Sequence, residues 1–174
     1  AYISLIQIST KTKHYILDVL SLGSIEPFKE ILLNQNIQKV FHDVGFDFRI
    51  LNHQFKCIPR NTFDTQLAAL LLGKEKIGLG NLFEEYFNIT KEKKFQRVDW
   101  TRRPLSQEML AYAIKDTAYL LELKRKLEQE LIEKNRLNWI VEENKKLESM
   151  DFSYKEQSFI DLPRAKSLTP KQKS

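Results

Sequence analysis

One helix predicted in this chain carries a carboxylate within its apolar stripe. The stretch 108–127, EMLAYAIKDTAYLLELKRKL, carries apolar residues at helical spacing. At about 100° per residue, the helix places Asp116 within roughly 40° of Tyr112 and Leu120, and no Lys or Arg of the helix shares that face. An unpaired carboxylate in an apolar interior costs several kcal/mol. We therefore expect Asp116 to be matched by a cation, by hydrogen-bond donors or by a proton.

The composition is that of one globular domain. With 174 residues, 42% of them hydrophobic, the chain can bury one sizeable core. We expect the domain to cover residues 1–148 and a basic, Pro- and Ser-containing linker or tail to cover 149–174. The single cysteine, Cys57, excludes an internal disulfide framework and a cysteine-rich zinc cluster. It fits a reducing compartment, and we predict a cytoplasmic location.

The charge balance favours a polyanionic partner. The formal net charge is +5, and positive charge is densest over 91–103, KEKKFQRVDWTRR, where Phe95 and Trp100 are interleaved with the basic residues. The same composition suits a solvated loop with two aromatic anchors, so charge alone leaves both interpretations open. No window approaches the ~20 apolar residues of a membrane span, and we expect no membrane partner.

All the predicted strands lie within the first 42 residues, and only helices are predicted after them. Residues 1–10 and 14–20 are predicted to form a hairpin, and a compact strand is predicted over 38–42. The predicted helices cover 26–34, 44–55, 63–73, 78–89, 106–134 and 135–148. Ser106 is expected to cap the start of the longest of these helices. Asp64 is expected to cap the helix that begins next to it in the sequence.

Tyr112 and Asp116 are the first candidates for chemistry. They stand four residues apart, so both project from one face of a helix and can reach one bound ion or water. The same spacing also suits a tyrosine that packs in the core and bonds its hydroxyl to a structural aspartate.

A second candidate lies in residues 40–51, VFHDVGFDFRIL. A predicted strand ends at His42 and a helix begins, with Asp43 and Asp47 at the junction. The carboxyl ends of strands are where open α/β folds gather reactive groups. The structural alternatives are that Asp43 is an N-cap, that Asp47 is an acid favoured by the helix dipole, and that His42 is a hydrogen-bonded core residue.

Two carboxylates on separate helices, with a tyrosine beside one of them, suit phosphoryl chemistry. Hard cations such as Mg²⁺ and Mn²⁺ prefer oxygen ligands, and two of them about 4 Å apart can stabilise the attacking and leaving oxygens of phosphodiester cleavage. Holding two dications normally takes about four carboxylates, and the residues above supply two.

At this point the motifs match a known family. The chain resembles ribonuclease D and its relatives, the DEDD-type 3′-5′ exonucleases with a tyrosine in the third motif. LIQIS and ILDVL resemble two strands of that fold, KVFHDVGFDFRIL resembles its second motif, and VDWTRRPL followed by YAIKD resembles its DWxxRPL segment and third motif. The resemblance implies an α/β fold of the ribonuclease H type, with a central mixed sheet flanked by helices.

The resemblance also implies an activity and roles for residues. It implies a metal-dependent 3′-5′ exoribonuclease that acts on RNA 3′ ends such as those of tRNA precursors, with two divalent ions, Mg²⁺ or Mn²⁺, as cofactors. Asp47 and Asp116 would be metal ligands, and Tyr112 would orient or help deprotonate the attacking water. The nucleic-acid contacts we predict are His42, Arg102 and Arg103. The expected partner is RNA, with single-stranded DNA as the alternative, and we expect a monomer.

The resemblance has one gap. The family's first motif, an Asp-x-Glu pair on its first strand, would lie upstream of Ala1, so two of the four metal-binding carboxylates are absent from this sequence. We therefore expect a sheet without its first strand and a fragment with weak or no activity. The basic tail resembles the lead-in to a helical nucleic-acid-binding domain.

Three other hypotheses remain open. One is a 3′-5′ exonuclease that acts on DNA. Another is a catalytically inactive module of the same fold that binds nucleic acid or docks a protein. The last is an unrelated α/β domain in which the YxxxD spacing is fortuitous.

Overall fold

The computed structural model describes residues 2–92 and 94–152, so the predicted tail from residue 153 onward lies outside the described residues. The elements follow the order β1 Leu5–Ser9, β2 His14–Asp18, α1 Glu26–Leu33, β3 Lys39–Phe41, α2 Val44–Phe55, β4 Thr62–Asp64, α3 Thr65–Leu71, α4 Leu79–Phe87, α5 Gln107–Ala118, α6 Leu120–Glu133 and α7 Leu137–Ser149.

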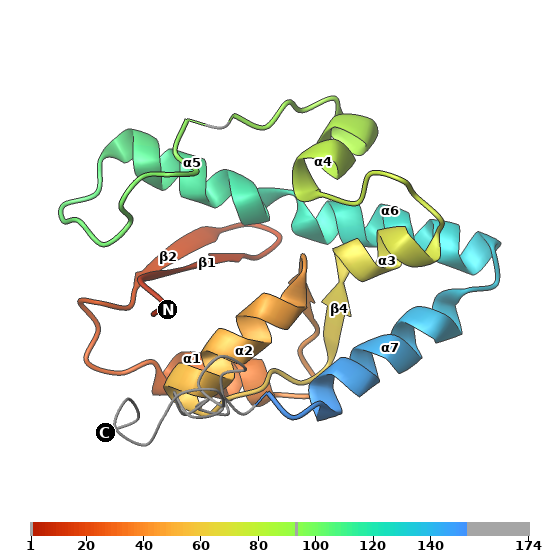
Figure 1. The fold of residues 1–174 in the computed structure, drawn as a ribbon, viewed down its shortest axis with the longest axis horizontal. Coiled ribbons are helices and arrows are strands. Elements are labelled where there is room, and N and C mark those ends of the chain that lie inside the picture. Colours follow the sequence, from red (N-terminus) through yellow and green to blue (C-terminus); the bar gives the residue numbers. More distant parts are fainter. Residues whose placement is uncertain (1, 93, 153–174) are drawn as a thin grey trace, which may run out of the picture.

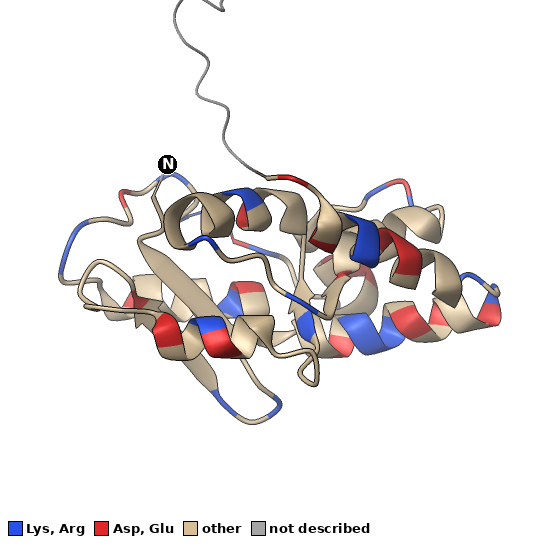
Figure 2. Ribbon diagram, turned by 90° about the horizontal axis from the view of Figure 1, so that it is seen from below, with Lys and Arg blue, Asp and Glu red and all other residues tan. Residues whose placement is uncertain are grey.

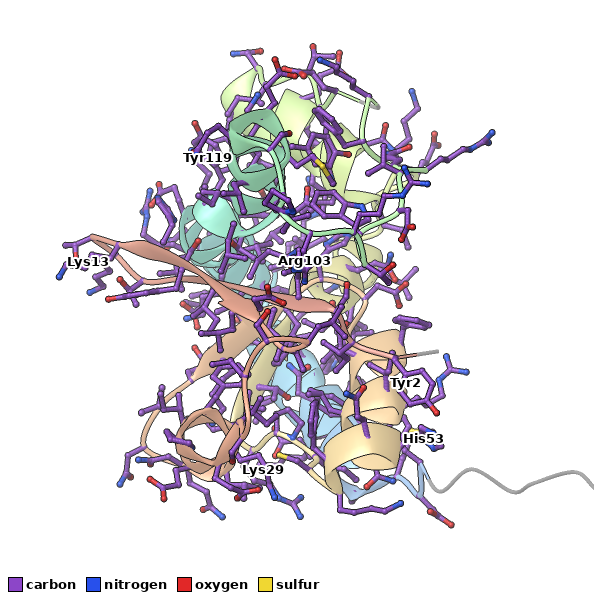
Figure 3. The ribbon with its side chains drawn as sticks, turned by 90° about the vertical axis from the view of Figure 1, so that its left-hand side faces the viewer. Tyr2, Lys13, Lys29, His53, Arg103 and Tyr119 are labelled. Carbon is purple, nitrogen blue, oxygen red and sulfur yellow. The ribbon has the colours of Figure 1, made fainter. Side chains whose placement is uncertain are left out.

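The first two strands form the predicted hairpin. They pair antiparallel, from Leu5 opposite Asp18 to Ser9 opposite His14. The polar stretch between them makes the turn, and Figure 3 shows Lys13 pointing away from the body of the molecule at its tip. The hairpin prediction is confirmed.

The fourth strand corrects the sequence analysis, which predicts a helix over 63–73. Thr62–Asp64 instead runs parallel to β3, with Lys39 opposite Thr62 and Phe41 opposite Asp64. The helix begins only at Thr65 because Asp64 is its N-cap and has the extended backbone that this position requires, with φ −96° and ψ 115°. The strand is too short for an alternating pattern to reveal it.

The strands lie between helices, which makes this an α/β fold. The predicted mixed sheet is seen as two two-stranded sheets, one antiparallel and one parallel. Helix α5 packs against β1 and β2, and α7 packs against β4. In the view of Figure 1, α5 lies above the hairpin while α1 and α2 lie below it.

The larger hydrophobic core lies around α6. Leu123, Leu127 and Leu131 recur at helical spacing and are fully buried. Through this stripe α6 packs on α3, α4 and α7. A smaller core built on α1 and α2 contains Leu32, Leu51 and Cys57.

The prediction of one continuous helix over 106–134 is wrong, because the structure divides this stretch into two helices. Helix α5 ends at Ala118 and α6 begins at Leu120, and Tyr119 between them has φ −106° and ψ 0°. The Tyr119 ring packs against Phe83 and Phe87 of α4, with ring centroids 5.7 and 5.5 Å apart. Since α5 packs on the hairpin and α6 on other helices, Asp116 does not share one buried stripe with the leucines of α6.

Charged side chains of both signs are spread over the helices. Figure 2 shows Lys and Arg alternating with Asp and Glu along the helical segments rather than collecting on one of them. In the described part of the chain, no helix is long and apolar enough to cross a membrane.

Candidate active site

Tyr112 and Asp116 lie one helical turn apart on α5 and line the same pocket. The helix starts where predicted, because the Ser106 hydroxyl accepts a hydrogen bond from the Met109 amide at 3.2 Å. Its far end is tied to the hairpin by a 2.7 Å hydrogen bond between the Ser9 and Thr117 hydroxyls. The pocket has a volume of about 330 Å³ and is lined by Ser4, Leu5, Gln7, Lys91, Phe95, Gln96, Trp100, Tyr112, Ala113 and Asp116.

The ring of Tyr112 is held by aromatic residues of the basic loop. Trp100 stacks on it with centroids 6.2 Å apart, and Phe95 contacts it edge-on at 5.4 Å. Trp100 is fixed in turn by a 3.2 Å hydrogen bond from its indole nitrogen to the Phe95 carbonyl. Tyr112 is only 6% exposed, so its orientation is set by packing.

Asp116 has a basic partner that the sequence analysis does not foresee. The Lys91 ammonium lies 2.6 Å from Oδ1 of Asp116, although no Lys or Arg of α5 faces that carboxylate. Oδ1 is itself buried and, among the described residues, accepts no hydrogen bond, so the contact is an ion pair without good hydrogen-bond alignment. The expectation that Asp116 is matched by a cation, by donors or by a proton is thus met here by a lysine from outside its own helix. The partner comes from the loop after α4, which helical spacing cannot reveal.

Asp47 lies in the first turn of α2 among other carboxylates. Burial, and to a smaller extent the negative charges of Asp43 and Asp64, raise its pKa to about 6. The interpretation of Asp43 as a cap fails, because its backbone is left-handed with φ 61° and its side chain makes no capping hydrogen bond within the described chain.

Asp64 does the capping for two helices. Its Oδ1 accepts hydrogen bonds from the amides of Gln66 at 2.8 Å, Leu67 at 3.4 Å and Asp43 at 3.1 Å, and its Oδ2 accepts one from Val44 at 3.0 Å. The predicted cap on α3 is confirmed. The second cap, on α2, was missed because the two segments are brought together only by the parallel pairing of β3 and β4.

His42 lies at the end of β3 beside these acids. Its Nδ1 shares a 2.9 Å hydrogen bond with the Thr65 hydroxyl, while its Nε2 is buried and finds no partner in the described residues. Burial lowers the pKa of His42, the charges of Asp64 and Asp43 oppose that shift, and the charge of Lys91 adds to it. Lys91, the ion-pair partner of Asp116, thus also acts on His42 through its charge.

The two predicted arginine contacts differ. Arg103 donates to Asp18 from Nε at 2.6 Å and from Nη2 at 2.5 Å, and also to the carbonyl oxygens of Trp100 and Ser4. Figure 3 shows Arg103 beside the hairpin. This bidentate pair anchors the loop to β2, and the nucleic-acid contact of Arg103 stays a prediction. Arg102 has an 84% exposed side chain.

The carboxylates have the donor chemistry that a divalent ion needs. Asp116 Oδ1 is a buried oxygen without a hydrogen bond, and Asp47 adds a carboxylate from a second helix. Such oxygens are the ligands of hard divalent cations. In residues 2–92 and 94–152, however, no group of three or more His, Cys, Asp or Glu side chains is arranged to hold a metal ion. The described residues therefore supply carboxylate oxygens of the chemistry that a divalent cation needs, without forming a complete ligand set.

Comparisons with known proteins agree with this chemistry. A family model described as 3′-5′ exonuclease matches residues 1–132. The exosome complex exonuclease RRP6 of Saccharomyces cerevisiae is 35% identical over 153 residues, which cover 87% of this chain and 21% of that protein. Ribonuclease D of Zymomonas mobilis is 38% identical over 146 residues, covering 82% of this chain and 37% of that protein. The chain thus spans well under half the length of these relatives.

Solved structures show the same fold. The catalytic core of RRP6 from Trypanosoma brucei superposes with a TM-score of 0.82 at 33% identity, covering 86% of this chain and 42% of that one. Escherichia coli RNase D superposes with a TM-score of 0.78 at 29% identity, covering 83% and 39%. NrnC of Brucella melitensis with bound Mg²⁺ gives 0.78 at 27% identity, covering 85% and 74%.

The match extends from the hairpin through nearly all of α6, and with the tyrosine and aspartate of α5 it defines a 3′-5′ exonuclease domain. Within that class, the chain belongs to the ribonuclease D family. The predicted ribonuclease H-like α/β fold is confirmed by the solved neighbours.

Proposed function

We propose that this chain is the exonuclease domain of a metal-dependent 3′-5′ exoribonuclease that removes nucleotides from RNA 3′ ends. The observation that carries the proposal is the pocket on α5, where Tyr112 and Asp116 project together beneath the aromatic residues of the basic loop. The relatives are ribonuclease D and an exosome exonuclease, and E. coli RNase D is an exoribonuclease involved in structured RNA processing. Structured RNA precursors are therefore the substrate class we propose.

Asp47 and Asp116 are the proposed metal ligands, and Mg²⁺ or Mn²⁺ in a two-ion arrangement is the proposed cofactor. When bound, such ions would supply positive charge to the scissile phosphate. Tyr112 is proposed to orient the attacking water and assist its deprotonation. Its buried ring is fixed by Trp100 and Phe95, which supports a positioning role because small displacements of a reacting group slow catalysis strongly.

For the RNA itself we propose contacts with His42 and Arg102. His42 offers a buried Nε2 near the acids, and Arg102 is exposed on the loop that packs over Tyr112. A monomeric, cytoplasmic protein remains our prediction.

The test compares matched RNA and DNA oligonucleotides labelled at the 5′ end, digested by the complete protein that carries this sequence in Mg²⁺ or Mn²⁺. We expect a ladder that shortens one nucleotide at a time from the 3′ end of the RNA. Preferential shortening of DNA would favour the DNA exonuclease instead. Absence of digestion of either substrate, with both metals, would contradict the enzymatic proposal.

A further inference from the structure

The ion pair between Lys91 and Asp116 differs from the other lysine pairs in the same region. Lys115 meets Glu92 at 3.0 Å and Lys94 meets Glu108 at 2.8 Å, but in both pairs each side chain is more than half exposed. The side chains of Lys91 and Asp116 are only 20% and 37% exposed. The Lys91 pair therefore lies in a partly desolvated place, where charge interactions are stronger than at the surface.

The backbone of α4 helps hold Lys91 in this place. Its aliphatic stem runs along Gly80, and a methyl group built on that glycine would lie 3.5 Å from the Lys91 Cβ. Packing of the stem lowers the freedom of the side chain. The ammonium is thus held beside Asp116, whereas the ammonium of a flexible, exposed lysine would sample many positions.

The position of the ammonium matters because Asp116 is also the proposed metal ligand. A lysine ammonium 2.6 Å from Oδ1 occupies space that a cation bound to that oxygen would need. Because Oδ1 accepts no hydrogen bond from the described residues, the pair lacks the alignment that would make it hard to displace.

We propose that Lys91 is an internal counter-ion of Asp116 that competes with divalent cations for its carboxylate and so sets how tightly the site binds them. This inference rests on the proposed function, since it takes Asp116 as a metal ligand. Without a divalent ion, the ammonium neutralises the carboxylate. When a divalent ion binds, the ammonium has to leave Oδ1, and its remaining positive charge in the pocket weakens binding by repulsion.

The experiment is a Mn²⁺ titration of the full chain, in which free Mn²⁺ is followed by its electron paramagnetic resonance signal. Lys91→Met removes the charge and keeps an apolar stem, Lys91→Gln also removes the charge, and Lys91→Arg keeps it. Lys115→Met is the matched control, because it makes the same change of net charge at an exposed pair on α5. We expect Lys91→Met and Lys91→Gln to bind Mn²⁺ about tenfold more tightly than the unsubstituted chain. Lys91→Arg and Lys115→Met should stay within about twofold of it.

The second measurement is the melting temperature of each variant, with and without Mn²⁺. In metal-free buffer Lys91→Met should melt at a lower temperature than the unsubstituted chain, because Asp116 loses its counter-ion, and Mn²⁺ should raise its melting temperature by more. In an Asp116→Asn background, Lys91→Met should change neither quantity. Mn²⁺ affinity that is equal or weaker in both charge-removing variants, including no measurable binding by any of them, would overturn the proposal.

These outcomes are separate from those of the nuclease assay. If the complete protein digests RNA but Lys91→Met binds Mn²⁺ with unchanged affinity, the counter-ion role is contradicted and the proposed function stands. Tighter Mn²⁺ binding without RNA digestion would support the counter-ion role and contradict the proposed activity.

Discussion

Replacing Asp47 by Asn should make the metal-free protein more stable at neutral pH while removing a proposed metal ligand. Burial and the neighbouring acids raise the pKa of Asp47 from an ordinary 3.8 to about 6. The folded protein therefore binds more protons than the unfolded chain between these values, and its stability falls as the pH rises through that window. The penalty is complete above about pH 7 and amounts to at most ~3 kcal/mol. Asn resembles the protonated acid in shape and escapes this penalty.

The assay is urea denaturation in EDTA, followed by tryptophan fluorescence, at pH 4, 6 and 7.5. We expect Asp47→Asn to match the unsubstituted protein at pH 4 and to be up to ~3 kcal/mol more stable at pH 7.5. Asp43→Asn serves as the comparison, because it removes only a charge near Asp47, from an exposed position. It should raise the free energy of unfolding at pH 7.5 by less than Asp47→Asn does. Parallel pH profiles for Asp47→Asn and the unsubstituted protein would refute the argument.

Three further predictions concern catalysis, capping and the loop anchor. In the complete enzyme, Asp116→Asn should abolish metal-dependent digestion of RNA, and Tyr112→Phe should slow it by about 10² or more with little change in metal affinity; equal single-turnover rates for Tyr112→Phe would exclude its role. Asp64→Ala should destabilise the fold by about 2–4 kcal/mol because two helices lose their cap, whereas Asp64→Asn should cost less since one oxygen can still accept; equal urea midpoints for the two variants would contradict this. The Arg103 guanidinium holds the pKa of Asp18 well below its usual range, so the stability from this pair is present above about pH 4 and is lost at lower pH. Asp18→Asn should therefore be less stable than the unsubstituted protein at pH 7, and its melting temperature should fall less as the pH is lowered below about 4. An equal fall of the melting temperature in both proteins would argue against the anchor.

Much of the fold follows from local patterns in the sequence. The hairpin, α1 and α2 were predicted because apolar periodicity and turn residues identify them within short windows. Strand β4 was missed because three residues carry no period, and its pairing with β3 depends on a segment more than twenty residues away. The break at Tyr119 was missed for a related reason. Its cause is packing on Phe83 and Phe87, which no helical pattern records.

Sequence reasoning selects the candidate residues but does not reveal the partners that the structure gives them. Tyr112, Asp116, Asp47 and His42 stand out by spacing and by position at the ends of elements, which sequence can show. Lys91 does not stand out, because it is one of several lysines in a basic loop and only the folded chain brings it to Asp116. A long-range ion pair of this kind leaves no periodic or local signal.

The structure stabilises the carboxylates of Asp47, Asp64 and Asp116 in three different ways. Asp64 is matched by backbone amides at two helix ends, Asp116 by the ammonium of Lys91, and Asp47 by a proton that its raised pKa allows it to keep below about pH 6. Only the first solution uses several aligned hydrogen bonds, and it is the one expected to persist. Each of the other two acids is neutralised by a single partner, the Lys91 ammonium or a proton, which a divalent cation can replace. Since Asp47 and Asp116 are the proposed ligands, the acids with replaceable partners are those that the proposed chemistry needs to release.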